Sequence, residues 1–318
     1  EQPGTATQFE EFVAALRANL NDSITADAAS DMLSQHLVTR PVFDALFPGY
    51  EFTDHNPVAR VMQAMLTALE GSNLESETEA LAEFYESVRL RAAGIDNAEG
   101  KQRVITELYE KFFRLAFPRS ADALGIVYTP TEIVDFILRS VNDLLVTEFG
   151  TTISAPGVHV LDPFTGTGTF ITRLLASGLI APEDLARKFT SELHANEITL
   201  LAYYIAAANI EATFHDLTAS FAADAVAPAS ADPRAWVPFD GIVLADTFQM
   251  SEHEDVLDGL VFRTNSERAE RQLDLDIRVI VGNPPYSVGQ TSGNDNNANL
   301  RYPSLDARIE ATYAARST

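Results

Sequence analysis

Apolar residues recur with a period of about 3.6 through most of residues 7–148, which predicts that this part of the chain is mainly helical. The clearest amphipathic segment lies near the N-terminus, and its expected buried stripe is Phe9, Phe12, Val13, Leu16 and Leu20. The same spacing predicts further helices over residues 81–88 and 104–113. Prolines at positions 41, 48, 57 and 118 are expected to separate these helices, because proline fixes φ and lacks a backbone donor.

From residue 157 onward the pattern changes to short apolar runs that alternate with helical segments. The expected strands are 158–161, about 189–194, 241–245 and 277–281, and the expected helices are about 168–178 and 198–212. This alternation is typical of an α/β fold, in which helices flank a mostly parallel sheet and ligands bind at the carboxyl ends of the strands. Residues 217–238 and 287–303 are expected to be loops, because the first is rich in Ala, Pro and Asp and the second in Gly and Asn.

Composition narrows the chemistry that the chain can perform. The 318 residues suggest about two domains and include no cysteine, which excludes disulfides, thiolate metal ligands and a cysteine nucleophile. The six histidines are scattered without an H-x-x-x-H pair, so no metal site is expected. The net charge of −24, with only three lysines, argues against extensive phosphate contacts by this chain itself. No stretch is apolar and long enough for a membrane span and no signal peptide is evident, so the expected location is the cytoplasm.

The last predicted strand is followed directly by the tetrad Asn283-Pro284-Pro285-Tyr286. The Asn283 side-chain oxygen and the Pro284 carbonyl are suited to accept both N–H bonds of an amine, which would localise the nitrogen lone pair for attack. The prolines hold that carbonyl in place, and Tyr286 offers a flat ring on which a flipped-out base can stack. Asn-Pro and Pro-Pro are also common in stiff turns, so the tetrad alone does not decide between a catalytic site and a turn.

A glycine-rich turn follows the first predicted strand and reads Asp162-Pro163-Phe164-Thr165-Gly166-Thr167-Gly168-Thr169-Phe170. Gly166 and Gly168 permit close approach of a ligand to the backbone, and the helix behind them presents free N–H groups. The segment is not a nucleotide P-loop, because no Gly-Lys-Ser/Thr follows, and its glycine spacing is not that of a dinucleotide fingerprint. The alternative is an ordinary strand-to-helix turn.

The tripeptide Tyr128-Thr129-Pro130 precedes the glycine-rich turn in the sequence. The two residues that follow Pro130, Thr131 and Glu132, are typical of the start of a helix. The buried stripe expected for that helix is Ile133, Val134, Ile137, Leu138 and Val141.

Along the chain the Tyr-Thr-Pro motif comes first, the glycine-rich turn second and the Asn-Pro-Pro-Tyr tetrad last. In that order the three motifs resemble the amino-methylating DNA methyltransferases of the gamma arrangement, which use S-adenosylmethionine. The resemblance implies a Rossmann-like methyltransferase sheet in which the Asn283 tetrad is catalytic. It also implies that the methionine part of the cofactor is held by Asp162, Pro163, Gly166, Gly168 and Thr169, with Tyr128, Thr129 and Pro130 as further cofactor contacts. Glu197, after a short possible strand, would then bind the ribose hydroxyls. Asp246, at the end of the strand 241–245, would accept a hydrogen bond from the cofactor's adenine amine, with Phe248 near the ring.

The chain also resembles, over a wider range, the large single-chain type I SP restriction–modification enzymes. This resemblance includes the helical N-terminal part and the stretch 296–306, Asn-Asn-Ala-Asn-Leu-Arg-Tyr-Pro-Ser-Leu-Asp. It implies a helical spacer over residues 1–120 and a methyltransferase core over 121–318 that is incomplete at its C-terminus. It further implies nuclease, helicase and target-recognition domains in the same parent chain and double-stranded DNA as the partner. The start at Glu1 rather than Met favours a piece of a longer protein.

The function expected from these features is methylation of the N6 amine of adenine in DNA by the parent protein. Two alternatives remain open at this point. One is a protein-glutamine methyltransferase, which also uses Asn-Pro-Pro-Tyr, although the Tyr-Thr-Pro motif argues against it. The other is a non-catalytic, cofactor-binding coupling domain of a larger DNA translocase or nuclease, which the acidic surface and the early end of the chain favour. Methylation of the cytosine amine is a minor variant, since that chemistry more often has serine in place of Asn283.

Overall fold

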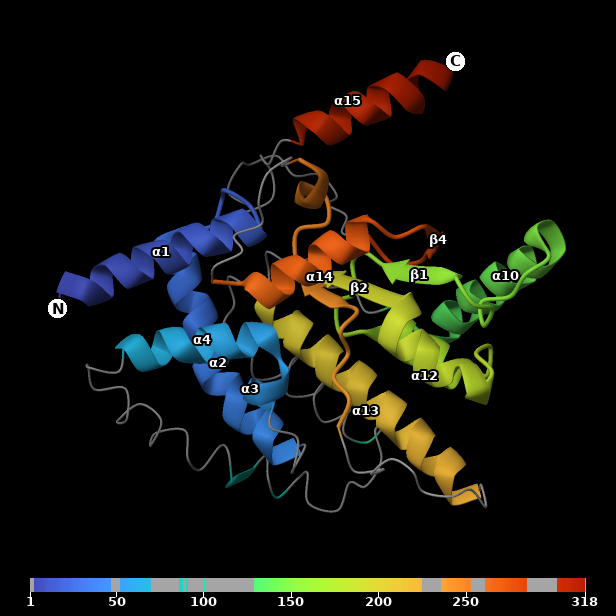
Figure 1. Cartoon of the computed structure of the whole chain (residues 1–318), viewed down its shortest axis with the longest axis horizontal. Helices are drawn as coiled ribbons and strands as arrows, with labels where there is room; N and C mark the ends of the chain where they lie inside the picture. The colour runs from blue at the N-terminus through green and yellow to red at the C-terminus, as the bar shows by residue number, and fades with distance from the viewer. Residues whose placement is uncertain are drawn as a thin grey trace.

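The computed structural model describes residues 3–46, 52–69, 86–87, 90, 100, 129–224, 236–252, 261–284 and 302–317. Within these ranges the N-terminal region contains the helices α1 (Pro3–Asn19), α2 (Ala26–Leu46), α3 (Phe52–His55) and α4 (Pro57–Leu69), which lie against one side of a mixed α/β unit (Figure 1). The stripe predicted for the first helix is confirmed, because four of its five residues are buried and Phe9 packs against the core. The helices predicted over 81–88 and 104–113 lie almost entirely outside the described residues, as does the boundary at residue 120, so the division into two domains stays a prediction.

Among the described residues, the strands form a four-stranded sheet in the order β3-β2-β1-β4, with every paired neighbour parallel. The strands are β1 (His159–Asp162), β2 (Leu193–Glu197), β3 (Ile242–Leu244) and β4 (Ile277–Ile280). The register pairs Asp162 with Ala195 and Glu197 with Leu244, so the carboxyl ends of the first three strands lie at one edge of the sheet. The predicted α/β class is therefore confirmed as a parallel sheet with flanking helices.

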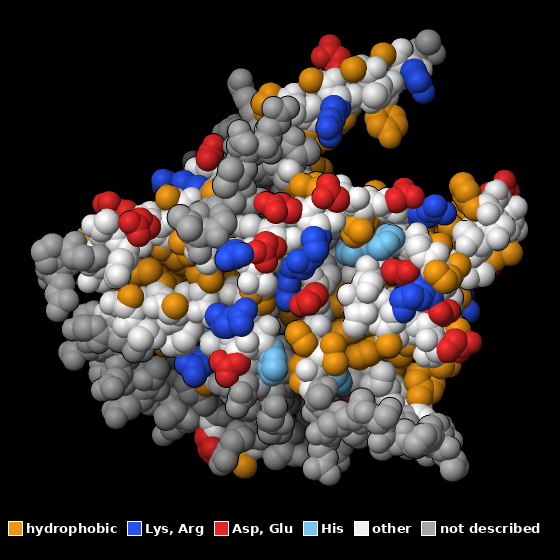
Figure 2. Space-filling view, in the orientation of Figure 1, with side chains coloured by type: hydrophobic (Ala, Val, Ile, Leu, Met, Phe, Trp, Pro, Cys, Tyr) orange, Lys and Arg blue, Asp and Glu red, His pale blue; other side chains and the backbone are white. Residues whose placement is uncertain are grey.

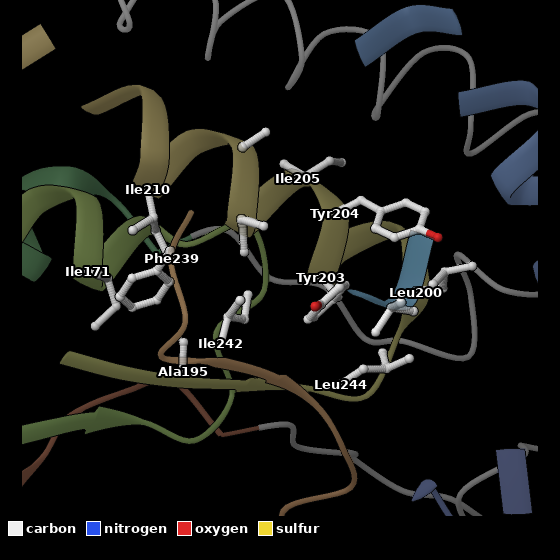
Figure 3. Close-up of a cluster of buried hydrophobic side chains, with 14 of the residues drawn as sticks. Ile171, Ala195, Leu200, Tyr203, Tyr204, Ile205, Ile210, Phe239, Ile242 and Leu244 are labelled. Carbon is white, nitrogen blue, oxygen red and sulfur yellow. The ribbon is translucent and has the colours of Figure 1, made fainter. Parts of the chain in front are cut away.

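The remaining α-helices of the described residues are α10 (Thr131–Phe149), α11 (Thr169–Ala176), α12 (Leu185–Arg187), α13 (Leu200–Asp224), α14 (Arg263–Leu273) and α15 (Pro303–Thr312). Short 3-10 turns occupy η2 (Pro182–Asp184), η4 (Gln249–Ser251) and η5 (Ala314–Arg316). The first part of helix α13, from Leu200 to Phe214, is mostly buried between the sheet and the N-terminal helices. In Figure 3, Tyr203 and Ile210 point from α13 toward the strands, while Tyr204 points to the side on which the N-terminal helices lie. The core is thus continuous between the two parts.

The strand predicted at about 189–194 is wrong over most of its length. Residues Lys188–Glu192 form the π-helical turn η3, and β2 begins only at Leu193. The side chain of Lys188 is fully buried, where its Nζ donates to the carbonyls of Ala155 (2.9 Å) and Val158 (2.8 Å) and pairs with Glu192 at 2.8 Å. An ammonium group has three N–H donors, and when it is buried all three need partners. In an extended strand Lys188 and Glu192 would lie about 13 Å apart, too far for this ion pair, whereas the helical turn brings them together.

Three further helical segments depart from the sequence-based expectation. Pro41 was expected to separate two helices, but it lies inside α2. The loop predicted from residue 217 is wrong as far as Asp224, because α13 continues to that residue, while 225–235 lie outside the described residues. Helix α14 was not predicted at all. Its buried positions are mostly polar, namely Asn265, Ser266, Arg268, Ala269 and Gln272, so it carries no apolar periodicity.

Helix α10 begins at Thr131 as expected and packs against α11. Val134 and Leu138 of its predicted stripe are buried and Ile137 and Val141 contact the core, but the burial predicted for Ile133 is wrong because half of that residue is exposed. An ion pair between Asp135 and Arg173, with N–O distances of 2.8 and 2.6 Å, joins α10 to α11. It fixes the helix that follows Thr129-Pro130 to the helix that follows the glycine-rich turn.

Candidate site at the carboxyl edge of the sheet

The glycine-rich turn links the end of β1 to α11. The hydroxyl of Thr165 donates to the carbonyl of Asp162 at 2.9 Å and closes the turn. Gly166 and Gly168 adopt φ values of +56° and +88°, which are unfavourable for residues with a Cβ. A Cβ on Gly168 would also lie 3.2 Å from Cα of Ala206, so this glycine allows α13 to pack closely against the turn.

The carboxyl group of Asp162 is buried at the centre of this edge. Its Oδ1 accepts a hydrogen bond from the backbone N–H of Phe164 at 3.2 Å, whereas Oδ2 has no hydrogen-bond partner. Burial raises the pKa of Asp162 to about 7; the nearby charge of Glu197 contributes to this rise, and the hydrogen bond from the N–H of Phe164 opposes it. A Cβ on Gly282 would lie 2.7 Å from Oδ1, so glycine is required where the chain leaving β4 passes this carboxyl group. A buried oxygen without a partner is uncommon in folded proteins and suits a ligand that supplies a donor.

Glu197, predicted to bind ribose hydroxyls, is largely occupied by the protein itself. Its Oε2 accepts from the N–H of Gly166 at 2.8 Å, and its Oε1 accepts from the N–H and the hydroxyl of Thr199 at 2.8 and 2.9 Å. Burial raises the pKa of this carboxyl group. Three of about four acceptor positions of the carboxylate are therefore used. Glu197 holds the glycine-rich turn against the start of α13, and its role toward a ribose stays a prediction.

Asp246, predicted to bind an adenine amine, follows β3 and is buried. Its Oδ1 accepts from the N–H of Phe248 at 3.0 Å. Its Oδ2 accepts from two groups far away in the sequence, Nδ2 of Asn21 at 3.2 Å and the hydroxyl of Tyr302 at 3.0 Å. The sequence analysis missed both partners. Tyr302 lies in the stretch 296–306 that carried the wider resemblance, whereas no pattern in the sequence pointed to Asn21.

Three aromatic rings lie next to Asp246. The Phe248 ring centroid is 5.3 Å from that of Phe164 and 5.4 Å from that of Tyr302, and Phe248 remains 37% exposed. The hydroxyl of Thr247 donates to the carbonyl of Pro163 at 2.7 Å, which ties the turn after β3 to the turn after β1. The edge of the sheet therefore offers buried acids at the carboxyl ends of β1, β2 and β3, and an aromatic surface beside the acid that follows β3.

The structure also brings together two motifs that are 154 residues apart. Nδ2 of Asn283 donates to the hydroxyl of Thr129 at 3.2 Å. Pro130 occupies the N-cap position of α10, so the hydroxyl of Thr129 is directed to Asn283 rather than used as a side-chain cap. Pro284 is exposed, whereas Tyr128, Pro285 and Tyr286 lie outside the described residues. The amine-clamping role of the tetrad stays a prediction.

The groups present at this edge fit the chemistry of S-adenosylmethionine. The orphan Oδ2 of Asp162 suits an ammonium or hydroxyl donor. Asp246 and Phe248 together suit a flat ring that carries a hydrogen-bond donor. Among the described residues, no group of three His, Asp or Glu side chains is arranged to hold a metal ion. None of the helices in the described ranges combines the length and the hydropathy that a bilayer crossing requires.

Comparison with known proteins assigns the N-terminal part. Residues 1–100 match the family model of the Type ISP restriction-modification enzyme coupler domain. A search of curated proteins finds no match.

Solved structures match over the whole chain. A nuclease-deletion mutant of the Type ISP restriction-modification enzyme LlaGI, in complex with a DNA substrate mimic, is 47% identical with a TM-score of 0.87. The ATP-dependent Type ISP restriction-modification enzyme LlaBIII bound to DNA is 46% identical with a TM-score of 0.88, and the DrdV–DNA complex is 36% identical with a TM-score of 0.85. All of this chain is covered in each case, but it spans only 25%, 21% and 29% of those chains, respectively.

The coupler match overturns the main functional expectation, that the chain is a site-specific adenine methyltransferase module. The motifs at the sheet edge led to that expectation, but the matched family model describes a coupling domain and not a catalytic one. The finding supports the alternative of a non-catalytic coupling domain better. The chain is homologous to segments of the Type ISP restriction-modification enzymes LlaGI and LlaBIII, and its residues 1–100 match the model of the coupler domain of that class.

Proposed function

We propose that this chain is a non-catalytic coupling module of a larger DNA-translocating or DNA-cleaving polypeptide, and that it binds S-adenosylmethionine at the carboxyl edge of its sheet. In this role the N-terminal helices transmit the state of the cofactor site to neighbouring domains of the longer chain. The observation that carries the proposal is the hydrogen bond between Asn21 in the coupler and Asp246 at the sheet edge.

Asn21 is held firmly enough to report on Asp246. The residue is buried in the turn between α1 and α2, where its Oδ1 accepts from both the N–H (3.1 Å) and the hydroxyl (2.5 Å) of Ser23. These bonds fix the orientation of the amide and direct Nδ2 to Asp246. A change in the position of the Asp246 carboxylate is therefore felt directly by the turn that joins the first two coupler helices.

Two further buried polar contacts connect the coupler to the α/β unit. The hydroxyl of Ser266 in α14 donates to Oδ1 of Asn19 at 3.0 Å. Nδ1 of His36 in α2 lies 3.0 Å from the hydroxyl of Tyr204 in α13. Polar contacts of this kind fix one relative orientation, because any shift leaves buried groups without partners.

Apolar packing supplies the rest of this interface. The rings of Phe12 in α1 and Phe262 next to α14 lie 6.1 Å apart, and those of Phe43 in α2 and Tyr204 lie 6.2 Å apart, edge to face. All four side chains are buried in one core that spans both parts. Burial of a large aromatic side chain contributes about 1.5–3 kcal/mol, so the coupler and the sheet are expected to move as a unit.

At the cofactor site, the residues of this chain would bind S-adenosylmethionine and fix its orientation. The Oδ2 of Asp162 would accept from the ammonium of the methionine part, and the N–H groups at the start of α11 face the same region. Asp246 and Phe248 would hold the adenine, and the last acceptor position of Glu197 would remain for a ribose hydroxyl. S-adenosylmethionine supplies, when bound, a sulfonium that can donate a methyl group.

DNA is the expected partner of the longer polypeptide rather than of this chain alone. The LlaGI, LlaBIII and DrdV structures all contain DNA or a DNA substrate mimic. The net charge here is −24, and on the face shown in Figure 2 Lys and Arg side chains lie among Asp and Glu side chains without forming a continuous basic region. Phosphate contacts require concentrated positive charge, so they are assigned to other domains of the longer chain.

The proposal is tested by titration calorimetry with S-adenosylhomocysteine, the demethylated and chemically stable product of the donor. We expect saturable binding at one site. The Asp162→Asn variant should bind about 10- to 150-fold more weakly, because a hydrogen bond to a charged group contributes about 1.5–3 kcal/mol. Asp143→Asn, which changes an exposed carboxyl group on α10, is the matched control and should bind as the wild type does.

Coupling is tested in the same samples by hydrogen exchange. The ligand should slow exchange of amides in the turn between α1 and α2, and Asn21→Ala should abolish that effect while binding persists. Absence of heat from a well-folded sample would remove the cofactor site. Binding without any change in the exchange of the coupler would remove the coupling role.

A further inference from the structure

Tyr302 occupies a place, here called the niche, beside Asp246 and Phe248 just beyond the end of β3. Its hydroxyl donates to Oδ2 of Asp246 at 3.0 Å, and its ring centroid lies 5.4 Å from that of Phe248 at an angle of 54°. The Phe248 ring also lies 5.3 Å from that of Phe164. A flat ring that carries a donor is therefore paired with a buried carboxylate and an aromatic neighbour.

The same niche has the chemistry of a purine amine site. A carboxylate accepts from an exocyclic N–H as it does from a phenol O–H, and the face or edge of Phe248 packs against either ring. Asp246 and Phe248 are the residues assigned above to the adenine of S-adenosylmethionine. Tyr302 therefore makes both contacts that the adenine would make.

We propose that Tyr302 occupies the place of the donor's adenine in this state, so that Tyr302 and the donor exclude one another. This inference rests on the proposed function of the sheet edge as a cofactor site. When the donor enters, Tyr302 leaves Asp246, and the bond from Asn21 to the same oxygen persists, so that any adjustment of the carboxylate to the adenine reaches the turn between α1 and α2. The sheet edge is thus closed by the chain's own side chain until ligand replaces it.

Displacement of Tyr302 loosens α15, which begins at the next residue. No residue of α15 is buried, and the helix projects from the rest of the molecule in Figures 1 and 2. Its start is held by Glu252, whose Oε2 and Oε1 accept from the N–H groups of Ser304 and Leu305, both at 2.8 Å. Tyr302 adds a second attachment beside Glu252. Donor binding removes that second attachment and leaves α15 held at its first turn only.

The competition has a measurable consequence for affinity. The apparent dissociation constant equals the intrinsic one divided by the fraction of molecules in which the niche is open. If Tyr302 occupies the niche in about nine molecules of ten, its removal strengthens binding about tenfold. A side chain that merely lined the site would have the opposite effect, because its removal would take contacts away from the ligand.

The experiment is titration of S-adenosylhomocysteine into the wild-type chain and into Tyr302→Ala, Tyr302→Phe and Tyr313→Ala. Tyr313 is an exposed tyrosine on the same C-terminal segment and provides the matched control. We expect about tenfold tighter binding for Tyr302→Ala, a smaller gain for Tyr302→Phe, which keeps the ring but loses the hydroxyl, and no change for Tyr313→Ala. Methionine, which lacks the adenine ring, should bind equally to all four proteins.

Unchanged or weaker binding of S-adenosylhomocysteine to Tyr302→Ala would overturn the inference while leaving the cofactor site in place. A failure of all four well-folded proteins to bind it would remove the cofactor site and the inference together.

Hydrogen exchange provides a second measurement. In the wild type, the ligand should speed exchange of the Ser304 and Leu305 amides. In Tyr302→Ala that exchange should be fast from the start.

Discussion

The carboxyl group of Asp162 has an unusual balance of contacts for a buried acid. One oxygen accepts a single backbone N–H and the other has no partner, so burial raises its pKa to about 7. The folded protein therefore binds a proton that the unfolded chain has lost, and the free energy of unfolding falls as pH rises from about 4 to about 7.

A pH series on Asp162→Asn tests this reading. Between pH 5.5 and 7.5 the wild type should lose about 2 kcal/mol of unfolding free energy through this one group. The asparagine side chain of the variant cannot ionise, so the variant should lose correspondingly less over the same range, as measured by urea unfolding. Parallel pH profiles for the two proteins would contradict the assignment of the raised pKa to Asp162.

Gly282 determines how closely the chain leaving β4 can pass Asp162. A Cβ at this position would lie 2.7 Å from Oδ1 of Asp162 and 3.4 Å from Cδ of Pro163. Gly282→Ala should therefore destabilise the protein by about 1–3 kcal/mol, the usual result of adding volume to a packed site. Thermal unfolding measures the loss, and an unchanged Tm would show that the two segments can separate without cost.

At the scale of elements, α14 shows how a polar helix can complete a sheet. β3 is an edge strand, and Asn265 of α14 binds its backbone as another strand would. Oδ1 of Asn265 accepts from the N–H of Leu244, and Nδ2 donates to the carbonyl of Leu244, both at 2.9 Å. The sheet edge is thereby protected from other chains without a further strand at this position.

Asn265→Ala should be strongly destabilising, because it leaves a buried N–H and a buried carbonyl of Leu244 without partners. The expected loss is about 2–4 kcal/mol, since each unsatisfied group costs about 1–3 kcal/mol. The neighbouring Thr264 is exposed, so Thr264→Ala controls for a change of helix propensity and should cost less than about 0.5 kcal/mol. Chemical unfolding of both variants makes the comparison, and equal losses would argue against the role of Asn265.

These elements also show why the sequence predicted some parts of the fold and not others. The stripe around Leu16, the glycine-rich turn and the strands around Val160 and Val243 were predicted because burial there is apolar and follows the period of a helix or strand. Helix α14 and the π-turn at Lys188 were not, because their buried groups are polar and are satisfied by residues distant in sequence. Periodicity records apolar burial only.

The candidate site follows the same rule. Local motifs pointed to Asp162, Glu197 and Asp246 as polar groups at the edge of the sheet, and the structure places all three there. Partners such as Asn21 and Tyr302 could not be predicted, because each lies on a separate segment that only the tertiary fold brings to Asp246.

For the whole molecule, the contact between the N-terminal helices α1–α4 and the α/β unit should be sensitive to acid. His36 is fully buried in α2, between the hydroxyl of Tyr204 and Oε1 of Gln63. With Gln63 as acceptor, Nε2 carries the proton and Nδ1 accepts from Tyr204, an arrangement that requires the neutral ring. Burial lowers the pKa of His36 to about 4. The unfolded chain therefore binds the extra proton first, and the unfolding free energy decreases as pH falls from about 6.5 to about 4.

His36→Gln separates this effect from those of other groups, because glutamine cannot ionise but can still accept from Tyr204 and donate to Gln63. From pH 7 to pH 5 the wild type should lose about 2 kcal/mol through His36, and the variant should be spared that loss. His194, whose pKa is also lowered to about 4, stays in both proteins and cancels in the comparison.

Because His36 and Tyr204 lie on opposite sides of the interface, the acid-induced loss should first appear as faster hydrogen exchange in α2 and α13. Uniform acceleration over the sheet instead would place the acid-sensitive group elsewhere.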